Sequence, residues 1–157
     1  LWHYDEDFKE WEESPETFDW DGISVDLDKR VTAIHISNKN FYGEIPSATI
    51  GGLSRLTSLR LDHNYLSGKL FSSLTQLANL TVLDMARNRI SGTIPTKLSR
   101  MTSLRRLSLG MNKARHCIPP QLGNMSSLQT LDLASNNLQG CIPASFGSLT
   151  DLRELWL

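Results

Sequence analysis

Histidines and cysteines are the residues of this sequence whose types could support metal binding or nucleophilic chemistry. His35 and His63, the latter beside Asp62, offer imidazole and carboxylate groups, but their spacing matches no known zinc-ligand pattern. Surface histidines are the alternative. No glycine-rich phosphate loop follows a predicted strand, and no serine stands in the turn that exposes a catalytic nucleophile. We therefore predict no catalytic residue, no metal site and no cofactor, and a protein that is not an enzyme.

Basic residues gather in one stretch of the chain. The net charge is −1, yet the first 30 residues contain eleven Asp or Glu and three Lys or Arg, so the remainder is basic. The stretch contains Arg87, Arg89, Arg105, Arg106, Lys113 and Arg115. Like charges so close favour an acidic partner, which would be a protein surface, a uronic-acid glycan or an anionic lipid headgroup. The alternative is solvated surface, with arginine stems covering apolar atoms.

A repeat of 24 residues must position these side chains. Leucines recur at this interval, and all but the last open the pattern Leu-x-x-Leu-x-Leu-x-x-Asn, in which x is variable and Met once replaces the third Leu. The leucines are Leu56, Leu80, Leu104, Leu128 and Leu152, and the asparagines are Asn64, Asn88, Asn112 and Asn136. A degenerate first repeat begins at Val31. Repeats of this length indicate a solenoid, in which each repeat is one coil.

Each part of the repeat has a structural interpretation. The alternation in Leu-x-Leu predicts a short strand, and stacked coils place these strands in a parallel sheet. The asparagines should form an internal ladder by bonding backbone groups of the bend. Leu98 and Met101, three residues apart, suit a turn of 3-10 helix on the convex side. An amphipathic helix is the alternative, but the recurrent Gly and Pro would break it.

The repeat continues as Leu-x-Gly-x-Ile-Pro and resembles the plant-specific class of leucine-rich repeats, found in receptor-kinase ectodomains and polygalacturonase-inhibiting proteins. Plant members have Cys-x-Trp-x-Gly-Val-x-Cys before the first repeat. Trp20 and Gly22 match this motif, whereas Phe18 and Val25 replace the cysteines, as in similar bacterial, algal and protist proteins. The resemblance implies an α/β solenoid. It would be a right-handed superhelix with one parallel sheet on its concave face, short 3-10 or helical turns on its convex face, and a small helical N-terminal cap.

We expect two units in the chain. Residues 1–30 form the cap, and residues 31–157 form five full coils and the start of a sixth. The aromatic residues of the cap are expected to cover the first coil, and a sugar-binding platform is the alternative. The sixth coil leaves three apolar side chains at an open end, namely Leu152, Leu155 and Leu157. Because solenoids need polar end caps, we expect the polypeptide to continue or a partner to cover this end.

The outward positions of the predicted sheet are the candidate binding surface. They are His35, Arg60, Asp84, Ser108, Asp132 and Trp156, with Asp62 two positions after Arg60. Solenoids generally bind on this extended surface. We predict a recognition module that binds a protein or peptide through this sheet and through the basic stretch of the third and fourth coils. The alternatives are a structural scaffold subunit of a larger assembly and a module that binds an acidic polysaccharide. Neither a nucleic-acid ligand nor a membrane-spanning segment is expected.

Two features bear on compartment and redox state. Asn79 and Asn124 stand in glycosylation sequons, which favour an extracellular or cell-surface location. The missing cap disulfide instead fits an organellar or intracellular subunit of a complex. Cys117 and Cys141 occupy the same position of adjacent coils, so we expect their Cα atoms about 5 Å apart. Because parallel side chains keep their Cβ atoms just as far apart, we predict free thiols.

Overall fold

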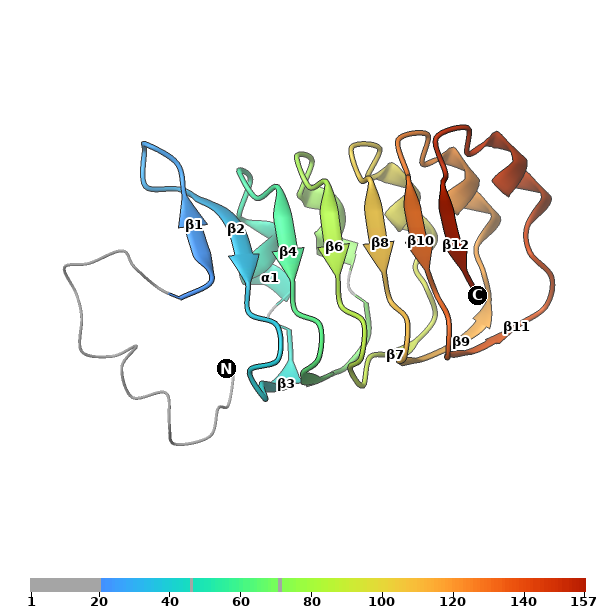
Figure 1. Ribbon diagram of the computed structural model, residues 1–157, viewed down its shortest axis with the longest axis horizontal. Helices are drawn as coiled ribbons and strands as arrows, with labels where there is room; N and C mark the ends of the chain where they lie inside the picture. Colours follow the sequence, from blue (N-terminus) through green and yellow to red (C-terminus); the bar gives the residue numbers. More distant parts are fainter. Residues whose placement is uncertain (1–20, 46, 71) are drawn as a thin grey trace.

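Short strands at regular intervals form the main sheet of this chain. The computed structural model describes residues 21–45, 47–70 and 72–157. Within this part, seven strands form one sheet, here called the concave sheet, in the order β1-β2-β4-β6-β8-β10-β12. They are β1 (Ile23–Val25), β2 (Val31–His35), β4 (Ser58–Arg60), β6 (Val82–Asp84), β8 (Arg106–Ser108), β10 (Thr130–Asp132) and β12 (Glu154–Trp156). From β2 onwards the strands are parallel and lie side by side (Figure 1), which confirms the predicted solenoid.

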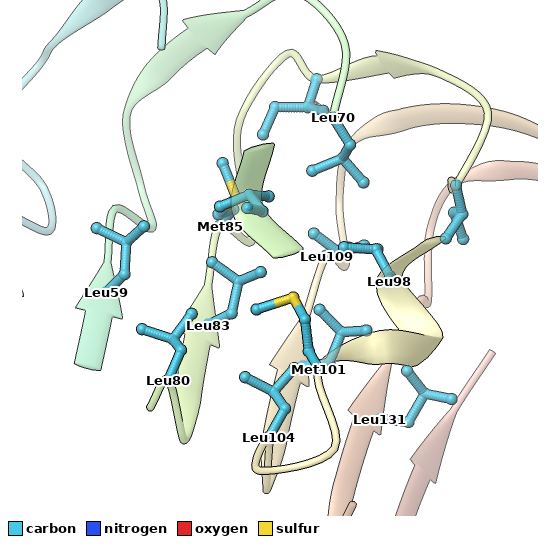
Figure 2. Close-up of a cluster of buried hydrophobic side chains, with 14 of the residues drawn as sticks. Leu59, Leu70, Leu80, Leu83, Met85, Leu98, Met101, Leu104, Leu109 and Leu131 are labelled. Carbon is cyan, nitrogen blue, oxygen red and sulfur yellow. The ribbon is translucent and has the colours of Figure 1, made fainter. Parts of the chain in front are cut away.

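The 24-residue repeat sets the register of the concave sheet. Leu59 pairs with Leu83, and Leu83 pairs with Leu107, so equivalent residues of successive coils lie side by side. All three leucines are fully buried. Figure 2 shows Leu59 and Leu83 projecting from adjacent strands into the apolar interior. Because successive residues of a strand point to opposite faces, the side chains between the leucines face solvent.

The described part of the N-terminal cap is an antiparallel strand. Ile23 of β1 lies opposite Ile34 of β2. Gly22, just before β1, has a φ of +85°, and a Cβ atom there would lie 2.1 Å from the carbonyl oxygen of His35. The glycine that matches the plant cap motif is therefore required by the close approach of two backbones. Phe18, Trp20, the other aromatic residues of the cap and its predicted helix lie outside the described residues.

A second set of short strands follows the bends at the ends of the concave strands. β3 (Tyr42–Glu44) pairs with β5 (Tyr65–Ser67), and a three-stranded sheet contains β7 (Ser91–Gly92), β9 (Lys113–Cys117) and β11 (Asn137–Gln139). In Figure 1 these strands run along the lower edge of the molecule, and we call them the flank. They are the extended segments that precede the Ile-Pro part of the repeat.

The flank is staggered relative to the concave sheet, and this corrects one expectation. Cys117 of β9 lies opposite Gln139 of β11, because these strands pair residues that differ by 22 in number. Cys117 and Cys141 therefore do not stack with their Cα atoms one strand spacing apart. Both thiols are free, as the sequence predicted, and both are exposed. The stagger between the strands is a cause of their separation that the sequence analysis did not include.

Helical turns line the side opposite the concave sheet. They are α1 (Ser47–Gly51), η2 (Ser72–Gln76), η3 (Thr96–Arg100), η4 (Pro120–Asn124) and η5 (Ala144–Ser148), of which the last four are 3-10 helices. Leu98 of η3 and the adjacent Met101 are buried in the same cluster as Met85 and Leu104 (Figure 2). The predicted Leu-x-x-Leu turns of the convex side are thus confirmed.

The asparagines form the predicted internal ladder. The amide nitrogen of Asn112 donates to the carbonyl oxygen of Leu109 in its own coil (3.0 Å) and to that of Met85 in the preceding coil (2.9 Å). Its oxygen accepts a hydrogen bond from the Ile90 N–H (2.9 Å). Equivalent bonds are made by Asn64, Asn88 and Asn136. Each asparagine therefore satisfies buried backbone groups of two coils that no strand partner reaches.

The inward leucines in β12 and directly after it are more exposed than their equivalents in earlier coils. Leu131 of β10 is fully buried, whereas Leu155 of β12 is 40% exposed. Leu133 is likewise buried, whereas Leu157 is exposed. That further chain or a partner covers these side chains stays a prediction.

Candidate ligand-binding surface

The outward side chains of the concave sheet form one row. His35 pairs with Arg60, and Arg60 pairs with Asp84. The row continues in register through Ser108, Asp132 and Trp156. His35, Arg60 and Trp156 are exposed, whereas the two aspartates are half-buried. An extended partner that lay along this row would meet one side chain from each coil.

Ser108 differs from the other members of the row. Its contact with a partner stays a prediction, and this residue is only 4% exposed, although it occupies an outward position of the row. The reason is its length, because the serine lies in register between Asp84 of β6 and Asp132 of β10. Repeat position predicts which way a side chain points, but the size of its neighbours decides how far it is covered.

Hydrogen bonds hold both histidines at the N-terminal end of this surface. The His35 Nε2 atom lies 2.7 Å from the Ser58 hydroxyl, and the His63 Nδ1 atom lies 2.8 Å from the Asp62 carboxylate. Burial and the charge of Arg60 lower the pKa of His35. Among the described residues, no group of three or more His, Cys, Asp or Glu side chains could hold a metal ion.

Two aspartates of the surface have pKa values shifted in opposite directions. Burial acts to raise the pKa of Asp62, but hydrogen bonds from Ser37 and His63 outweigh it and place that pKa below its usual value. For Asp84, burial is the largest influence and the negative charge of Asp62 adds to it, so the pKa of Asp84 is raised. The ionised form of Asp84 is therefore disfavoured by the fold.

Replacing Asp84 by asparagine should raise the free energy of unfolding relative to wild type, and the increase should be larger at neutral pH than at acidic pH. The folded-state pKa of Asp84 lies above its unfolded value, so ionisation lowers the stability of the wild type as pH rises through that window. Asparagine cannot ionise, and its oxygen can still accept the bond from the Ala86 N–H. Urea denaturation from pH 3 to 7 should show a growing advantage of Asp84→Asn over wild type. The same advantage for the exposed Asp151→Asn would contradict this explanation.

Small residues open a hollow in the concave sheet over β8. Its volume is about 270 Å³. Its lining contains the small residues Ser108, Gly110, Ala86 and Ala134. The lining also contains the larger side chains of Arg87, Arg106, Met111, Asp132, Glu154 and Trp156. Sequence reasoning did not identify Gly110, Met111 or Glu154 as site residues, although the small residues that follow the second strand leucine in three successive coils were a usable signal.

The structure places the six predicted basic side chains at two ends of the strands, although Arg87 and Arg106 both line the hollow. Four lie at the strand ends or in the flank, namely Arg87, Arg89, Lys113 and Arg115. Arg105 and Arg106 instead lie at the opposite end of the strands, where β8 begins, and Arg106 faces the hollow. Closeness along the sequence therefore does not bring all six side chains onto the flank, because a strand and a bend separate residue 105 from residue 113. We call the first four the basic edge.

Backbone and aromatic contacts fix part of the basic edge. Arg87 has a φ of +54°, at the left-handed position that precedes each ladder asparagine. The guanidinium carbon of Arg89 lies 4.8 Å from the centre of the Tyr65 ring, a cation–π contact that holds the side chain over the preceding coil. Within the described part of the chain, no salt bridge involves these four residues.

Both predicted glycosylation sites lie on the surface. Asn79 and Asn124 are exposed, and the Asn79 amide nitrogen donates to the carbonyl oxygen of Ser54 at 2.9 Å. Their glycosylation stays a prediction. In the described residues, no helix is long and apolar enough to cross a membrane.

The repeats match a known family over most of the chain. The family described as "Leucine rich repeat" matches residues 29–90 and 102–157. The chain belongs to the leucine-rich repeat family. A relative is the inactive leucine-rich repeat receptor-like serine/threonine-protein kinase of Arabidopsis thaliana, which is 40% identical over 65 residues. That match covers 41% of this chain and 11% of the kinase.

Solved structures of leucine-rich repeat proteins share this architecture. The ectodomain of the receptor kinase SOBIR1 from Arabidopsis thaliana has a TM-score of 0.78 and 30% identity, over 86% of this chain and 78% of that one. The plant peptide hormone receptor RGFR1, solved in complex with RGF2, has a TM-score of 0.77 and 35% identity, over 79% of this chain and 20% of that one. The chain is thus a plant-type leucine-rich repeat protein that resembles receptor-kinase ectodomains.

Proposed function

We propose that this chain is a non-catalytic recognition module of the cell surface that binds an extended protein or peptide segment across its concave sheet. The observation that carries the proposal is the solvent-open hollow over β8, which lies within the in-register row of outward side chains. The structure of RGFR1 with a peptide hormone supports it, because its repeats have the same architecture.

Selection of binding peptides from a random library tests this proposal. Peptides that bind the wild type should lose binding to the double variant Arg60→Glu and Asp132→Lys. Both changes reverse a charge of the outward row, so they disturb complementarity there and leave the buried leucines intact. Peptides that bind both proteins equally would place the site elsewhere and overturn the proposal.

The basic edge gives the partner a charge preference. Arg87, Arg89, Lys113 and Arg115 are exposed. A partner with acidic residues beside its central segment would relieve the repulsion among these cations. We infer that the acidic part of the partner lies against the basic edge.

Charge reversal at the basic edge should weaken binding of the selected peptides about tenfold at low ionic strength. A tenfold loss of affinity corresponds to about 1.4 kcal/mol of binding free energy. The variant is Arg87→Glu with Arg115→Glu. The difference from wild type should shrink as salt is added, because exposed charges are screened. Fluorescence titration at two salt concentrations measures both effects. The matched control is Lys97→Glu with Arg100→Glu, which changes the charge equally in η3 on the convex side. Equal losses in both variants would mean that only net charge matters.

A further inference from the structure

We propose that β9 binds a carboxylate side chain of the partner through His116 together with Lys113 and Arg115, an inference that rests on the proposed acidic partner. We call these three residues the carboxylate site. All three are exposed. β9 is the middle strand of the three-stranded sheet of the flank and pairs on both sides (Figure 1), so the site stands on a firm support.

His116 occupies a position of the repeat that glycine fills in the other coils. The equivalent residues are Gly43, Gly68, Gly92 and Gly140, which have φ values between +84° and +106°. His116 itself has a φ of +70°. This left-handed region is open to glycine but unfavourable for a residue with a Cβ atom. The backbone alone would therefore select glycine at position 116.

The space at this repeat position also favours glycine. A Cβ atom at position 92 would lie 3.1 Å from the Cγ atom of Lys69, and one at position 140 would lie 3.2 Å from the Sγ atom of Cys117. Both are close contacts with the side chain of the preceding coil. His116 thus departs from the repeat where backbone conformation and space both favour glycine, and residues kept in strained conformations cluster at functional sites.

The left-handed conformation brings the imidazole to the surface. Side chains alternate along a regular strand, so His116 would follow the buried Ala114 towards the interior. Its register partner Leu138 is accordingly half-buried. Instead Arg115, His116 and Cys117 are exposed one after the other. The imidazole therefore joins the exposed cationic side chain that precedes it in β9.

The surroundings of the carboxylate site are basic. The sequence has no Asp or Glu between Asp84 and Asp132, whereas the same stretch has eight Lys or Arg. Among the residues that the structure describes, none forms a salt bridge with a member of the site. Guanidinium, ammonium and imidazole N–H groups all donate to carboxylate oxygens. Carboxylates are the ordinary anionic side chains of a protein or peptide partner, so one of them suits this site.

Nuclear magnetic resonance with an acidic peptide tests the inference. The probe is acetyl-tetraglutamate amide, and its neutral counterpart is the tetraglutamine peptide. At low ionic strength, tetraglutamate should shift the amide signals of Arg115, His116 and Leu138, and tetraglutamine should bind at least about tenfold more weakly. Equal binding of the two peptides, or shifts confined to other residues, would overturn the proposal. Binding of tetragalacturonate without binding of tetraglutamate would overturn the assignment to a protein partner.

Replacing His116 by glycine should move stability and binding in opposite directions. Glycine adopts the left-handed conformation freely, so the melting temperature of His116→Gly should rise by roughly 2–4 °C. Tetraglutamate should bind about fivefold more weakly, because one donor is lost. His116→Asn should bind better than His116→Gly, since asparagine tolerates a positive φ and keeps a donor. The matched control is Asn38→Gly, at an exposed residue of the first coil with a φ of +56°, which should leave binding unchanged.

Two results for His116→Gly would contradict the inference. Unchanged binding of tetraglutamate would mean that the imidazole does not contact the carboxylate. A lower melting temperature would mean that the fold itself requires the histidine, which removes the reason to assign it to binding. If tetraglutamate fails to bind while selected peptides still lose binding to the Arg60→Glu and Asp132→Lys double variant, the proposed function stands and only the carboxylate site is wrong.

Discussion

Replacing Asn112 by alanine is expected to lower the free energy of unfolding by on the order of 3 kcal/mol. The Ile90 N–H would lose its bond to the Asn112 oxygen and remain buried without a partner. The carbonyl groups of Met85 and Leu109 would each keep one ladder bond, from Asn88 and Asn136. The Gly110 carbonyl oxygen would also lose a bond of 3.3 Å, so the loss combines one orphaned donor, three weakened acceptors and a small cavity. Urea denaturation measures it.

Asn137→Ala is the matched control for this prediction. Asn137 follows the ladder residue Asn136 and is exposed in β11, so its replacement should change stability by less than about 0.5 kcal/mol. If both variants lost the same stability, the effect would reflect the helix- and strand-forming tendencies of alanine rather than the ladder.

Replacing Gly123 by alanine should destabilise the convex side by about 1–3 kcal/mol. A Cβ atom at position 123 would lie 2.5 Å from the carbonyl oxygen of Ser145 and 2.7 Å from its carbonyl carbon. These are backbone atoms, so η4 and η5 would have to separate. That movement would also strain the bond from the Ser145 hydroxyl to the Pro120 carbonyl oxygen (2.6 Å). Thermal and urea denaturation would both detect the loss.

The chain contains its own control for this substitution. Gly147 occupies the equivalent place in η5, and a Cβ atom there would meet nothing within 4 Å. Gly147→Ala should therefore be neutral or slightly stabilising, because alanine restricts the unfolded chain more than glycine does. Equal destabilisation by the two variants would show that contact between helical turns is not the cause.

The repeat pattern made the concave sheet predictable. A constant interval of 24 residues placed Leu59, Leu83 and Leu107 in register, and the same interval aligned the outward side chains from His35 to Trp156. The ladder followed because asparagine combines a donor and an acceptor that suit the backbone of a bend. These features depend on position within the repeat, which the sequence states directly.

The hollow and the grouping of basic residues depend on other quantities. The burial of Ser108 follows from the sizes of Asp84 and Asp132, which repeat position does not measure. The separation of Arg106 from Lys113 and Arg115 follows from the bend between β8 and β9. Nearness along the sequence suggested one patch, but a coil turns the chain through several directions within a few residues.

The stagger of the flank changes what happens when a coil is duplicated during evolution. On the concave sheet, duplication sets each residue beside its own copy, because the pairing interval equals the repeat, as for Leu59 and Leu83. On the flank, a copied residue meets instead the residue two places earlier in the repeat, as Cys117 meets Gln139. Of these two sets of strands, the concave sheet is therefore the one in which a duplicated charge or thiol lies opposite its own copy. Co-variation between neighbouring coils should accordingly link equal repeat positions on that face and positions two apart on the flank.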